Sequence, residues 1–365
     1  MIERRQVLIG GGGLVIAGVA VSYLGIRQAG SLDQYNDAVA VTRAALSEQP
    51  EIADFIRYAT LAASGHNTQP WRFRASARKI EILPDLTRRT PVVDPDDHHL
   101  FVSLGCAAEN LGIAASERGR PGHVSFNPAA NASIDVMLDQ GAPLRSTLFD
   151  AIPQRQSTRG DYDGRQVSAS DMKTLAAASS IPGVDLVLIT ERPMIDRVRD
   201  LVVAGNTTQI SDPAFIVELK KWLRFSPHTA LETGDGLFSA ASGSPVMPDW
   251  LGTRGFDWAF TSRAENEKYI RQIATSSGIA VFVAEKDDRE HWVLAGRACQ
   301  RFALQATALG LKHAYINQPV EVAKLRPELA SLIGLPGRRP DIVMRFGYGP
   351  TLPYSARRPV SAVLA

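Results

Sequence analysis

The stretch ASGHNTQPW, residues 63 to 71, separates an apolar run from the aromatic pair Trp71 and Phe73. Its middle contains serine, histidine, asparagine, threonine and glutamine side chains in close succession. Such a density of hydrogen-bonding groups is too polar for a hydrophobic core and too specific for a spacer. What this segment holds depends on what the rest of the chain places beside it.

Composition limits the class of protein. The chain has 365 residues, of which 45% are hydrophobic and 21% charged, enough for one large core or two ordinary ones. Its 40 basic and 38 acidic residues give a net charge of +2, without a long basic stripe interleaved with aromatic residues. We therefore expect a globular protein that does not bind nucleic acid.

Neither the cysteines nor the histidines predict a metal site. Cys106 and Cys299 are the only thiols, too few and too far apart in sequence for a zinc site or a disulfide framework. The run from Asp94 to His99 is rich in aspartate and histidine, but adjacent residues rarely point at one ion. We interpret both cysteines as buried free thiols and this run as the capped start of a helix.

The N-terminal residues 1–30 differ from the rest of the chain. Arg4 and Arg5 precede an uncharged run from Val7 to Gly25 that is rich in glycine, alanine and valine. The pattern resembles a twin-arginine export signal. A plain membrane anchor is the alternative, because the run approaches the roughly 20 residues that span a bilayer. We expect export through the twin-arginine translocase, to a periplasmic or an outward-facing membrane-anchored location.

An internal repeat relates two alanine-rich segments. VSLGCAAENLGIAASERG, residues 102–119, aligns at one constant offset with VLAGRACQRFALQATALG, residues 293–310. Each segment predicts a helix that ends at a glycine and is followed by a β-prone stretch. A chance likeness between buried helices is the alternative. If the repeat is real, residues 31–150 and 151–365 are related halves, and a site is expected where they meet.

The remaining patterns predict a mixed helical and sheet structure. Residues 33–61 have helical periodicity, and residues 226–255 are rich in the residues of long loops. Strand-like runs occur at 79–83, 184–189, 279–283 and 342–346. Strands and helices do not alternate strictly, and the glycines at 10–13 lack the spacing of a dinucleotide-binding loop. We therefore predict an α+β fold in which helices cover a sheet.

A second polar cluster lies near the start of the second half. Arg155, Ser157 and Arg159 alternate in the sequence RQSTR, so an extended segment places both guanidinium groups and the hydroxyl on one side. This combination suits a phosphate monoester, because arginine offers permanently charged, bidentate donors. A solvated basic loop is the alternative.

Together, the two polar segments resemble those of the FMN-dependent nitroreductase superfamily, Arg-x-Ser-x-Arg and Pro-Ser-x-x-Asn-x-Gln-Pro-Trp. The chain matches the second at every signature position but the first, where Ala63 replaces proline. The order of the segments is inverted relative to ordinary members. The inversion, the fused halves and the N-terminal arginines make the chain similar to the narrower Acg-type FMN-binding oxidoreductases, over nearly the whole length that follows residue 30.

The resemblance implies a nitroreductase-like α+β fold whose two fused halves form an intramolecular pseudo-dimer with one FMN site. It implies phosphate contacts from the RQSTR segment and the C-terminal arginines, and flavin-ring contacts from the ASGHNTQPW segment. Residues 211–256 resemble the lid of Acg-type proteins. No catalytic residue and no metal ligand is implied. The cofactor-binding candidates are Ser64, Asn67, Gln69, Arg155, Ser157, Arg159, Asn317, Arg357 and Arg358.

Two functions follow from the resemblance. As an oxidoreductase, the protein would take electrons from a donor such as NAD(P)H and pass them through FMN to a small organic acceptor. As a flavin-sequestering or storage protein, it would hold FMN under a closed lid without turnover. The absence of a second Ser-x-x-Asn segment and an exported location favour the storage alternative. A structural pseudo-dimer that has lost FMN is a third interpretation.

Overall fold

The computed structural model describes residues 29–129 and 132–365. The predicted export signal and the glycines at 10–13 lie outside the described residues, so export stays a prediction. In the part of the chain that the structure describes, no helix combines the length and the apolar character needed to cross a bilayer.

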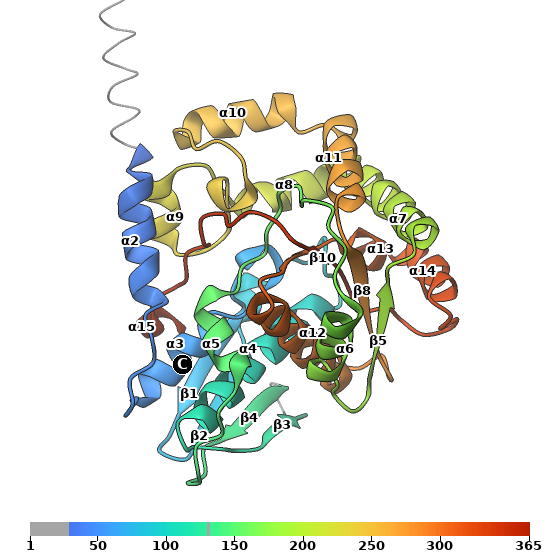
Figure 1. Ribbon diagram of the computed structural model, residues 1–365. Helices are drawn as coiled ribbons and strands as arrows, with labels where there is room; N and C mark the ends of the chain where they lie inside the picture. Colours follow the sequence, from blue (N-terminus) through green and yellow to red (C-terminus); the bar gives the residue numbers. More distant parts are fainter. Residues whose placement is uncertain (1–28, 130–131) are drawn as a thin grey trace, which may run out of the picture.

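Two four-stranded antiparallel sheets form the frame of the molecule, one in each half (Figure 1). The first has the order β1 (Trp71–Ala75), β2 (Lys79–Pro84), β4 (Ser133–Met137) and β3 (Val124–Asn127). The second has the order β5 (Val184–Ile189), β8 (Gly278–Ala284), β10 (Ile342–Gly347) and β9 (Lys312–Tyr315). The predicted strands and the predicted α+β fold are confirmed.

Helices surround and separate the two sheets. In the first half they are α2 (Leu32–Thr42), α3 (Ile52–Thr60), α4 (His98–Glu117) and α5 (Thr147–Ala151). In the second half they are α6 (Ala169–Ala178), α7 (Arg192–Ile210), α8 (Pro213–Lys221), α9 (Pro227–Thr233), α10 (Asp249–Ala259), α11 (Ser262–Ala274), α12 (Arg289–Ala308), α13 (Gln318–Glu321), α14 (Arg326–Leu332) and α15 (Val360–Val363).

Two sequence predictions need correction. The helical run predicted at 33–61 is divided into α2 and α3, because Pro50 lies between them and disfavours helical geometry at the preceding residue. The segment 226–255 is not one long loop, because it contains α9 and part of α10. Proline begins α9 at a position where its missing N–H costs no hydrogen bond.

The repeat predicted from sequence corresponds to matching structure in the two halves. Each half has the order strand, long helix, strand, strand: β2, α4, β3 and β4 in the first, and β8, α12, β9 and β10 in the second. Both long helices end before a glycine in the left-handed conformation, Gly119 at φ 69° and Gly310 at φ 73°. The two sheets also share one strand order. A chance likeness between two helices does not account for this agreement.

Helices α4 and α12 cross in the centre of the molecule between the two sheets (Figure 1). At the crossing, a Cβ atom added to Gly105 would lie 2.1 Å from the carbonyl oxygen of Val293. A Cβ atom added to Gly296 would lie 2.0 Å from the carbonyl oxygen of Val102. The contact is reciprocal between repeat-equivalent residues, as in an interface between two-fold-related subunits.

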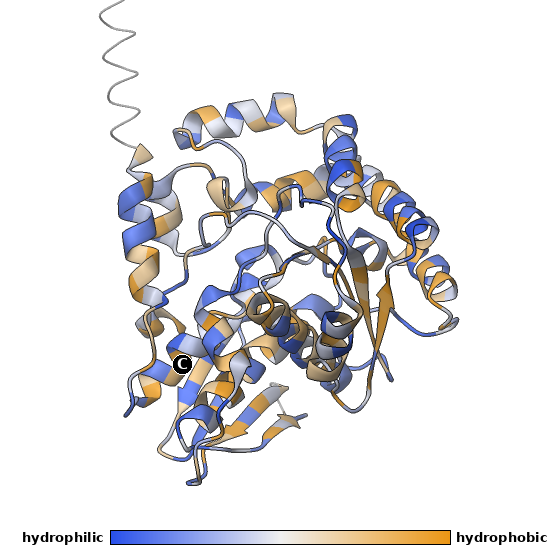
Figure 2. Ribbon diagram, in the orientation of Figure 1, coloured by the Kyte–Doolittle hydropathy of each residue, from blue (hydrophilic) through white to orange (hydrophobic). Residues whose placement is uncertain are grey.

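The core lies on both sides of the second sheet and on one side of the first. Every residue of β8 is buried, and Ala280 and Phe282 pack in the same core as α4 and α12. Val281, between them in the sequence, packs with α7 and α14 on the other face. In β1, by contrast, Trp71 and Phe73 are buried and the intervening residue is exposed. In Figure 2, the orange of hydrophobic residues is nearly continuous along β5 and β8 of the second sheet.

The helix crossing generates a stability prediction. Because a backbone carbonyl cannot move aside as a side chain can, Gly105→Ala should lower the free energy of unfolding by roughly 3 kcal/mol, measured by urea denaturation. The control is Gly112→Ala on the same helix, where the added Cβ meets only Val124 at 3.6 Å. That variant should gain about 0.5–1 kcal/mol. Equal effects of the two substitutions would contradict the proposed crossing.

Candidate functional site

A cavity of about 570 Å³ lies where the first half, the second half and residues 211–256 meet. This volume is within the range of about 300–1,000 Å³ that small-molecule and cofactor sites occupy. The first half contributes Ser64, His66, His99, Val102, Ser103 and Cys106, and the core of the second half contributes Arg159, Asn206, Gln209, Lys268, Tyr269, Tyr315, Asn317 and Glu321. The cavity therefore combines side chains from both halves.

Residues 211–256, which we call the lid segment, supply a mostly apolar wall of the cavity. The segment contains α8, most of α10 and a small parallel pair, β6 (Leu223–Arg224) and β7 (Leu237–Phe238). Its cavity-lining side chains include Phe215, Leu219, Phe225, Leu237, Met247 and Phe256. Charged side chains of the lining come from elsewhere in the second half, and they include Arg159, Lys268 and Glu321. A ligand with one flat apolar part and one charged part suits such a site.

The opening stretch ASGHNTQPW adopts a strained backbone beside the cavity. His66, Asn67 and Gln69 all have positive φ angles, 46°, 54° and 52°. For residues other than glycine this conformation costs roughly 1–2 kcal/mol each. Such strain persists only where surrounding contacts hold it, and it concentrates at functional sites. One of these contacts is local, because the Gln69 amide donates to Ser64 Oγ at 3.1 Å.

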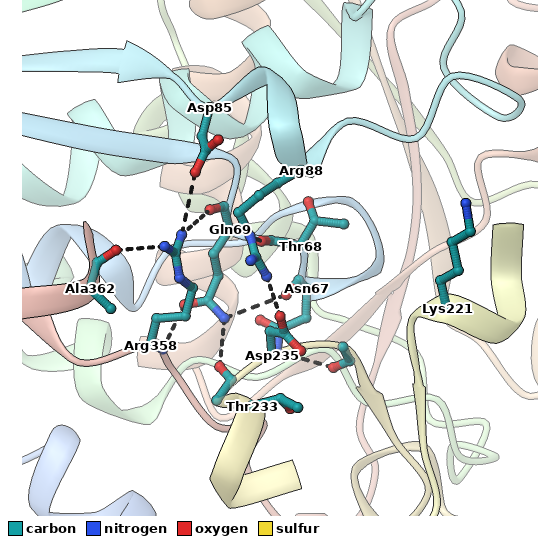
Figure 3. Close-up of polar contacts among 12 residues, drawn as sticks. Asn67, Thr68, Gln69, Asp85, Arg88, Lys221, Thr233, Asp235, Arg358 and Ala362 are labelled. Atoms are coloured by element: carbon teal, nitrogen blue, oxygen red, sulfur yellow. Dashed lines mark hydrogen bonds and ion pairs between the residues drawn. The ribbon is translucent and has the colours of Figure 1, made fainter. Parts of the chain in front are cut away.

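Tertiary hydrogen bonds hold the strained segment to the lid segment and the C-terminal tail (Figure 3). Asn67 Nδ2 donates to the carbonyl oxygens of Gly236 and Ala356, at 3.1 and 3.2 Å. Gln69 Nε2 donates to the Gly234 carbonyl oxygen at 2.8 Å, and Gln69 Oε1 accepts from the Arg358 amide at 2.9 Å. The side-chain polar groups of Asn67 and Gln69 are therefore bound by protein, while Ser64 and His66 line the cavity.

Asp235 is the ionic centre of the same network. Its carboxylate binds Arg224 Nη2 at 2.6 Å and also binds Arg88, whose Nε donates to the Thr68 carbonyl oxygen. The Asp235 side chain is only 8% exposed, so this pair of ionic contacts is mostly shielded from water. Through Arg88, Asp235 thereby joins the lid segment to Thr68 within the ASGHNTQPW stretch, as Figure 3 shows.

Two buried arginines, Arg43 and Arg155, and the partly buried Arg357 lie together, and none has a carboxylate partner among the described residues. Arg155 Nη2 and Arg357 Nη2 share the carbonyl oxygen of Leu61, at 3.1 and 3.3 Å. Arg43 Nη1 donates to the backbone of residues 153 and 155. Burial, and then the charge of Arg155, lower the pKa of Arg43 to about 9. Burial and the other two arginines also hold the pKa of Arg357 well below its usual value.

Buried charges in proteins are normally paired, and an anion would be a fitting partner for this cluster. Arg155 is 2% exposed, and among the described residues its Nε and Nη1 have no hydrogen-bond partner. Arg159 lines the cavity, burial lowers its pKa, and among the described residues no carboxylate is found to act on that pKa. An anionic group bound beside these side chains would offset the cost of their burial.

The RQSTR segment is extended, as the alternation predicted. It runs alongside β9, with a parallel bridge between Ser157 and His313 and a hydrogen bond from the Thr158 amide to the His313 carbonyl oxygen. Gln156, on the other side of the segment, is bound through both side-chain polar atoms to the backbone of Leu352. The side that carries Arg155, Ser157 and Arg159 is left for other contacts.

The structure brings only some of the predicted residues to the cavity. Ser64, Arg159 and Asn317 line it, and Asn317 Oδ1 also accepts from the Val343 amide. Arg155 is buried in the arginine cluster, and Ser157 is half-buried beside β9. Asn67, Gln69, Arg357 and Arg358 bind one another or the backbone around them. Their direct contact with a cofactor stays a prediction.

Two histidines of the cavity were not predicted as site residues. His66 lies inside the ASGHNTQPW stretch, and burial, then Arg159 and His99, lower its pKa to about 4. His99 begins α4 with His98, and burial lowers the pKa of His99 to about 3. Glu321, 3.8 Å from His99 Nε2, has a raised pKa through burial. The sequence signal was the Asp94 to His99 run, whose interpretation as a helix start is confirmed: Asp94 accepts from two amides of α4.

Comparison with known proteins gives relatives but no family model that matches. A protein of Mycobacterium tuberculosis H37Rv, provisionally named an NAD(P)H nitroreductase, is 27% identical over 319 residues, 84% of this chain and 88% of its own length. A second, provisionally named NAD(P)H nitroreductase acg, is 24% identical over 334 residues, 86% and 94% of the two chains. These relatives confirm the predicted resemblance to Acg-type proteins of the nitroreductase superfamily.

Solved structures with similar folds are more distant. A nitroreductase with bound FMN from Desulfitobacterium hafniense has 13% identity and a TM-score of 0.36, over 59% of this chain and 94% of its own. The FMN-dependent nitroreductase NfnB from Mycobacterium smegmatis, in complex with NADPH, has 12% identity and a TM-score of 0.37. The match covers 56% of this chain and 87% of the NfnB chain. Likeness at this level does not define the site.

The ionic centre at Asp235 generates a prediction about the lid segment. Removing one partner from a buried ion pair costs roughly 3–5 kcal/mol. Asp235→Asn should therefore speed amide hydrogen exchange in residues 211–256 by about 100-fold, measured by mass spectrometry. The control is Asp257→Asn, whose carboxylate pairs with Lys220 while 57% exposed. In that variant the free energy of the opening that permits exchange should change by less than roughly 1 kcal/mol. Equal exchange rates in the two variants would exclude Asp235 as the residue that holds the lid segment.

Proposed function

We propose that the protein is an FMN-binding oxidoreductase that passes electrons from a nicotinamide donor to a small organic acceptor. The observation that carries the proposal is the set of buried and partly buried arginines, without a carboxylate partner among the described residues, next to a cavity between two related halves. Relatives provisionally named NAD(P)H nitroreductases support it. FMN combines a phosphate with a flat aromatic ring, and the charged and apolar side chains around the cavity would suit these two groups.

The residues present fit the phosphate of FMN. Arg155 has two buried donor nitrogens without a partner in the described chain, and Arg159 reaches the cavity from the same extended side of the RQSTR segment. Ser157 lies between them in that alternation. We propose that these three hold the phosphate, because two guanidinium groups and a hydroxyl supply charge-assisted hydrogen bonds.

The ring of FMN would lie between the halves. Ser64 comes from the first half, Arg159 and Asn317 come from the second, and all three line the one cavity. The matching strand orders and the reciprocal helix crossing support an origin of the chain as two fused subunits. Asn67, Gln69 and Arg357 would act indirectly, by holding the ASGHNTQPW segment in its strained conformation.

When bound, FMN would supply reversible two-electron chemistry. The chain's own part is to orient the ring, exclude water and set the local charge. Ser64, which lines the cavity, would donate to the ring where reduction increases its negative charge, which favours the reduced state. With pKa values lowered to about 4 and about 3, His66 and His99 are neutral near pH 7 and act there as uncharged hydrogen-bonding groups. The apolar wall of the lid segment would exclude water and accept a flat acceptor molecule.

Storage of flavin without turnover is the second candidate function. It is favoured by the hydrogen bonds and ion pairs that join the lid segment to the ASGHNTQPW stretch and the tail. A cover held in this way slows exchange of any molecule between the cavity and solvent. Oxidoreductase and storage functions therefore differ in whether a donor reaches the site, and not in how FMN is bound.

The phosphate site is tested by FMN content. Arg159→Ala should raise the dissociation constant for FMN of residues 29–365 at least about tenfold, because a charged hydrogen bond contributes roughly 1.5–3 kcal/mol. Arg155→Ala with Arg159→Ala should abolish copurification. The control is Arg165→Ala, which removes a side chain that is 68% exposed a few residues away. Full FMN occupancy in the double variant would overturn the proposed phosphate site.

Reduction by NADPH separates the two candidate functions. The purified protein should show flavin absorption bands near about 370 and 450 nm, and anaerobic NADPH should bleach the band at longer wavelength. If access of NADPH through the lid segment limits the rate of reduction, the flavin band of the Asp235→Asn variant should bleach faster than that of the wild type. A flavin that NADPH leaves oxidised in both proteins, and that dithionite reduces, would instead support storage or another donor.

A further inference from the structure

The two cysteines of the chain lie in contact across the internal interface. Cys106 is on α4, Cys299 is on α12, and their Sγ atoms are 3.7 Å apart. Each thiol donates to the carbonyl oxygen of Gly296, at 3.2 and 3.3 Å. These are the only two cysteines in the sequence, and both are buried and free. A chain that has only two thiols thus brings them together from opposite halves.

The position of the pair follows from the helix crossing. Cys106 is next to Gly105, where the backbone of α12 approaches closest, and Cys299 is one turn beyond Gly296 on the facing helix. The absence of side chains at both glycines lets the two helix backbones come close enough for the thiols to touch. The contact is therefore built by the same crossing that joins the two halves.

The pair also borders the candidate flavin cavity. Cys106 lines the cavity directly, and Tyr315, another lining residue, lies beside Cys299. Among the described residues, the Tyr315 hydroxyl has no hydrogen-bond partner that meets ordinary geometry. The neighbouring Cys106 thiol and burial raise the pKa of Cys299 well above its usual value. Both thiols are buried, and Cys106 lines the cavity, so a small molecule in the cavity can reach the pair.

We propose that Cys106 and Cys299 are a redox-active dithiol that exchanges electrons with the flavin bound in this cavity. Two S–H bonds break and one S–S bond forms, while the two electrons and two protons released reduce the oxidised flavin to its dihydro form. The reverse reaction reduces the disulfide. This inference rests on the proposed function, because the flavin is the electron partner.

The dithiol gives one molecule a larger electron capacity. A flavin holds two electrons and a dithiol two more, so a fully reduced molecule would deliver twice as many electrons as the flavin alone. The oxidised form would also join α4 and α12 covalently. Redox state would thereby be coupled to how firmly the two halves are held together.

The first experiment tests the thiol pair without flavin. Native apoprotein treated with the thiol oxidant diamide should lose both free thiols, counted after denaturation, with a mass decrease of two hydrogens and no dimer. Cys106→Ser and Cys299→Ser should each keep their single thiol in the monomer. The serine hydroxyl can donate to Gly296 as the thiol does, so both variants are expected to fold. Failure of the folded wild type to form the internal disulfide would overturn the proposal.

The second experiment measures electrons in the flavin-loaded protein. After oxidation, anaerobic dithionite titration of the wild type should consume about two two-electron equivalents per flavin before reduction is complete, against about one in either serine variant or in the double variant. If the single and double variants lose the same number of reducing equivalents, the two cysteines act as one unit. One equivalent in the wild type would overturn the dithiol proposal and leave FMN binding intact. A wild type that binds no flavin would overturn the proposed function itself and, with it, the electron partner of the dithiol.

Discussion

The close approach of α4 and α12 at Gly105 and Gly296 is the constraint on which the rest of the structure depends. Each glycine faces a backbone carbonyl of the other helix at a distance that excludes any side chain. Because the contact is made twice, between equivalent residues, it fixes both the distance and the relative orientation of the two halves. The two sheets, the cavity between the halves and the contact between Cys106 and Cys299 all follow from that orientation.

The segments that surround the cavity exchange contacts between the halves. The RQSTR segment runs beside β9 of the second half, and its Arg155 donates to the Leu61 carbonyl oxygen of the first half. The C-terminal tail returns to the first sheet, where Leu364 pairs with Phe73 of β1. Arg357, just before α15, donates to the carbonyl oxygens of Thr60, the last residue of α3, and of Ala62, two residues beyond it. The arginines are therefore positioned by both halves at once, and their charge is concentrated where an anion can offset it.

The lid segment connects stability to function. Its apolar side chains form one wall of the cavity, whereas its attachment to the rest of the molecule is polar, through Asp235 and the side chains of Asn67 and Gln69. The same stretch that carries the strained backbone is thus held by the segment that forms one wall of the cavity. Opening the cover would release part of that strain, so cover and strained segment are expected to move together.

The sequence by itself determined the α+β class, the strands, the repeat and the extended form of RQSTR, because periodicity and turn residues act over a few neighbouring positions. It also determined the resemblance, through the spacing within ASGHNTQPW. Tertiary structure alone decided that Asn67 and Gln69 bind the lid segment and the tail, that His99 reaches the cavity, and that Cys106 touches Cys299. Those contacts join residues more than a hundred positions apart or depend on which way a side chain turns, and no local pattern encodes either.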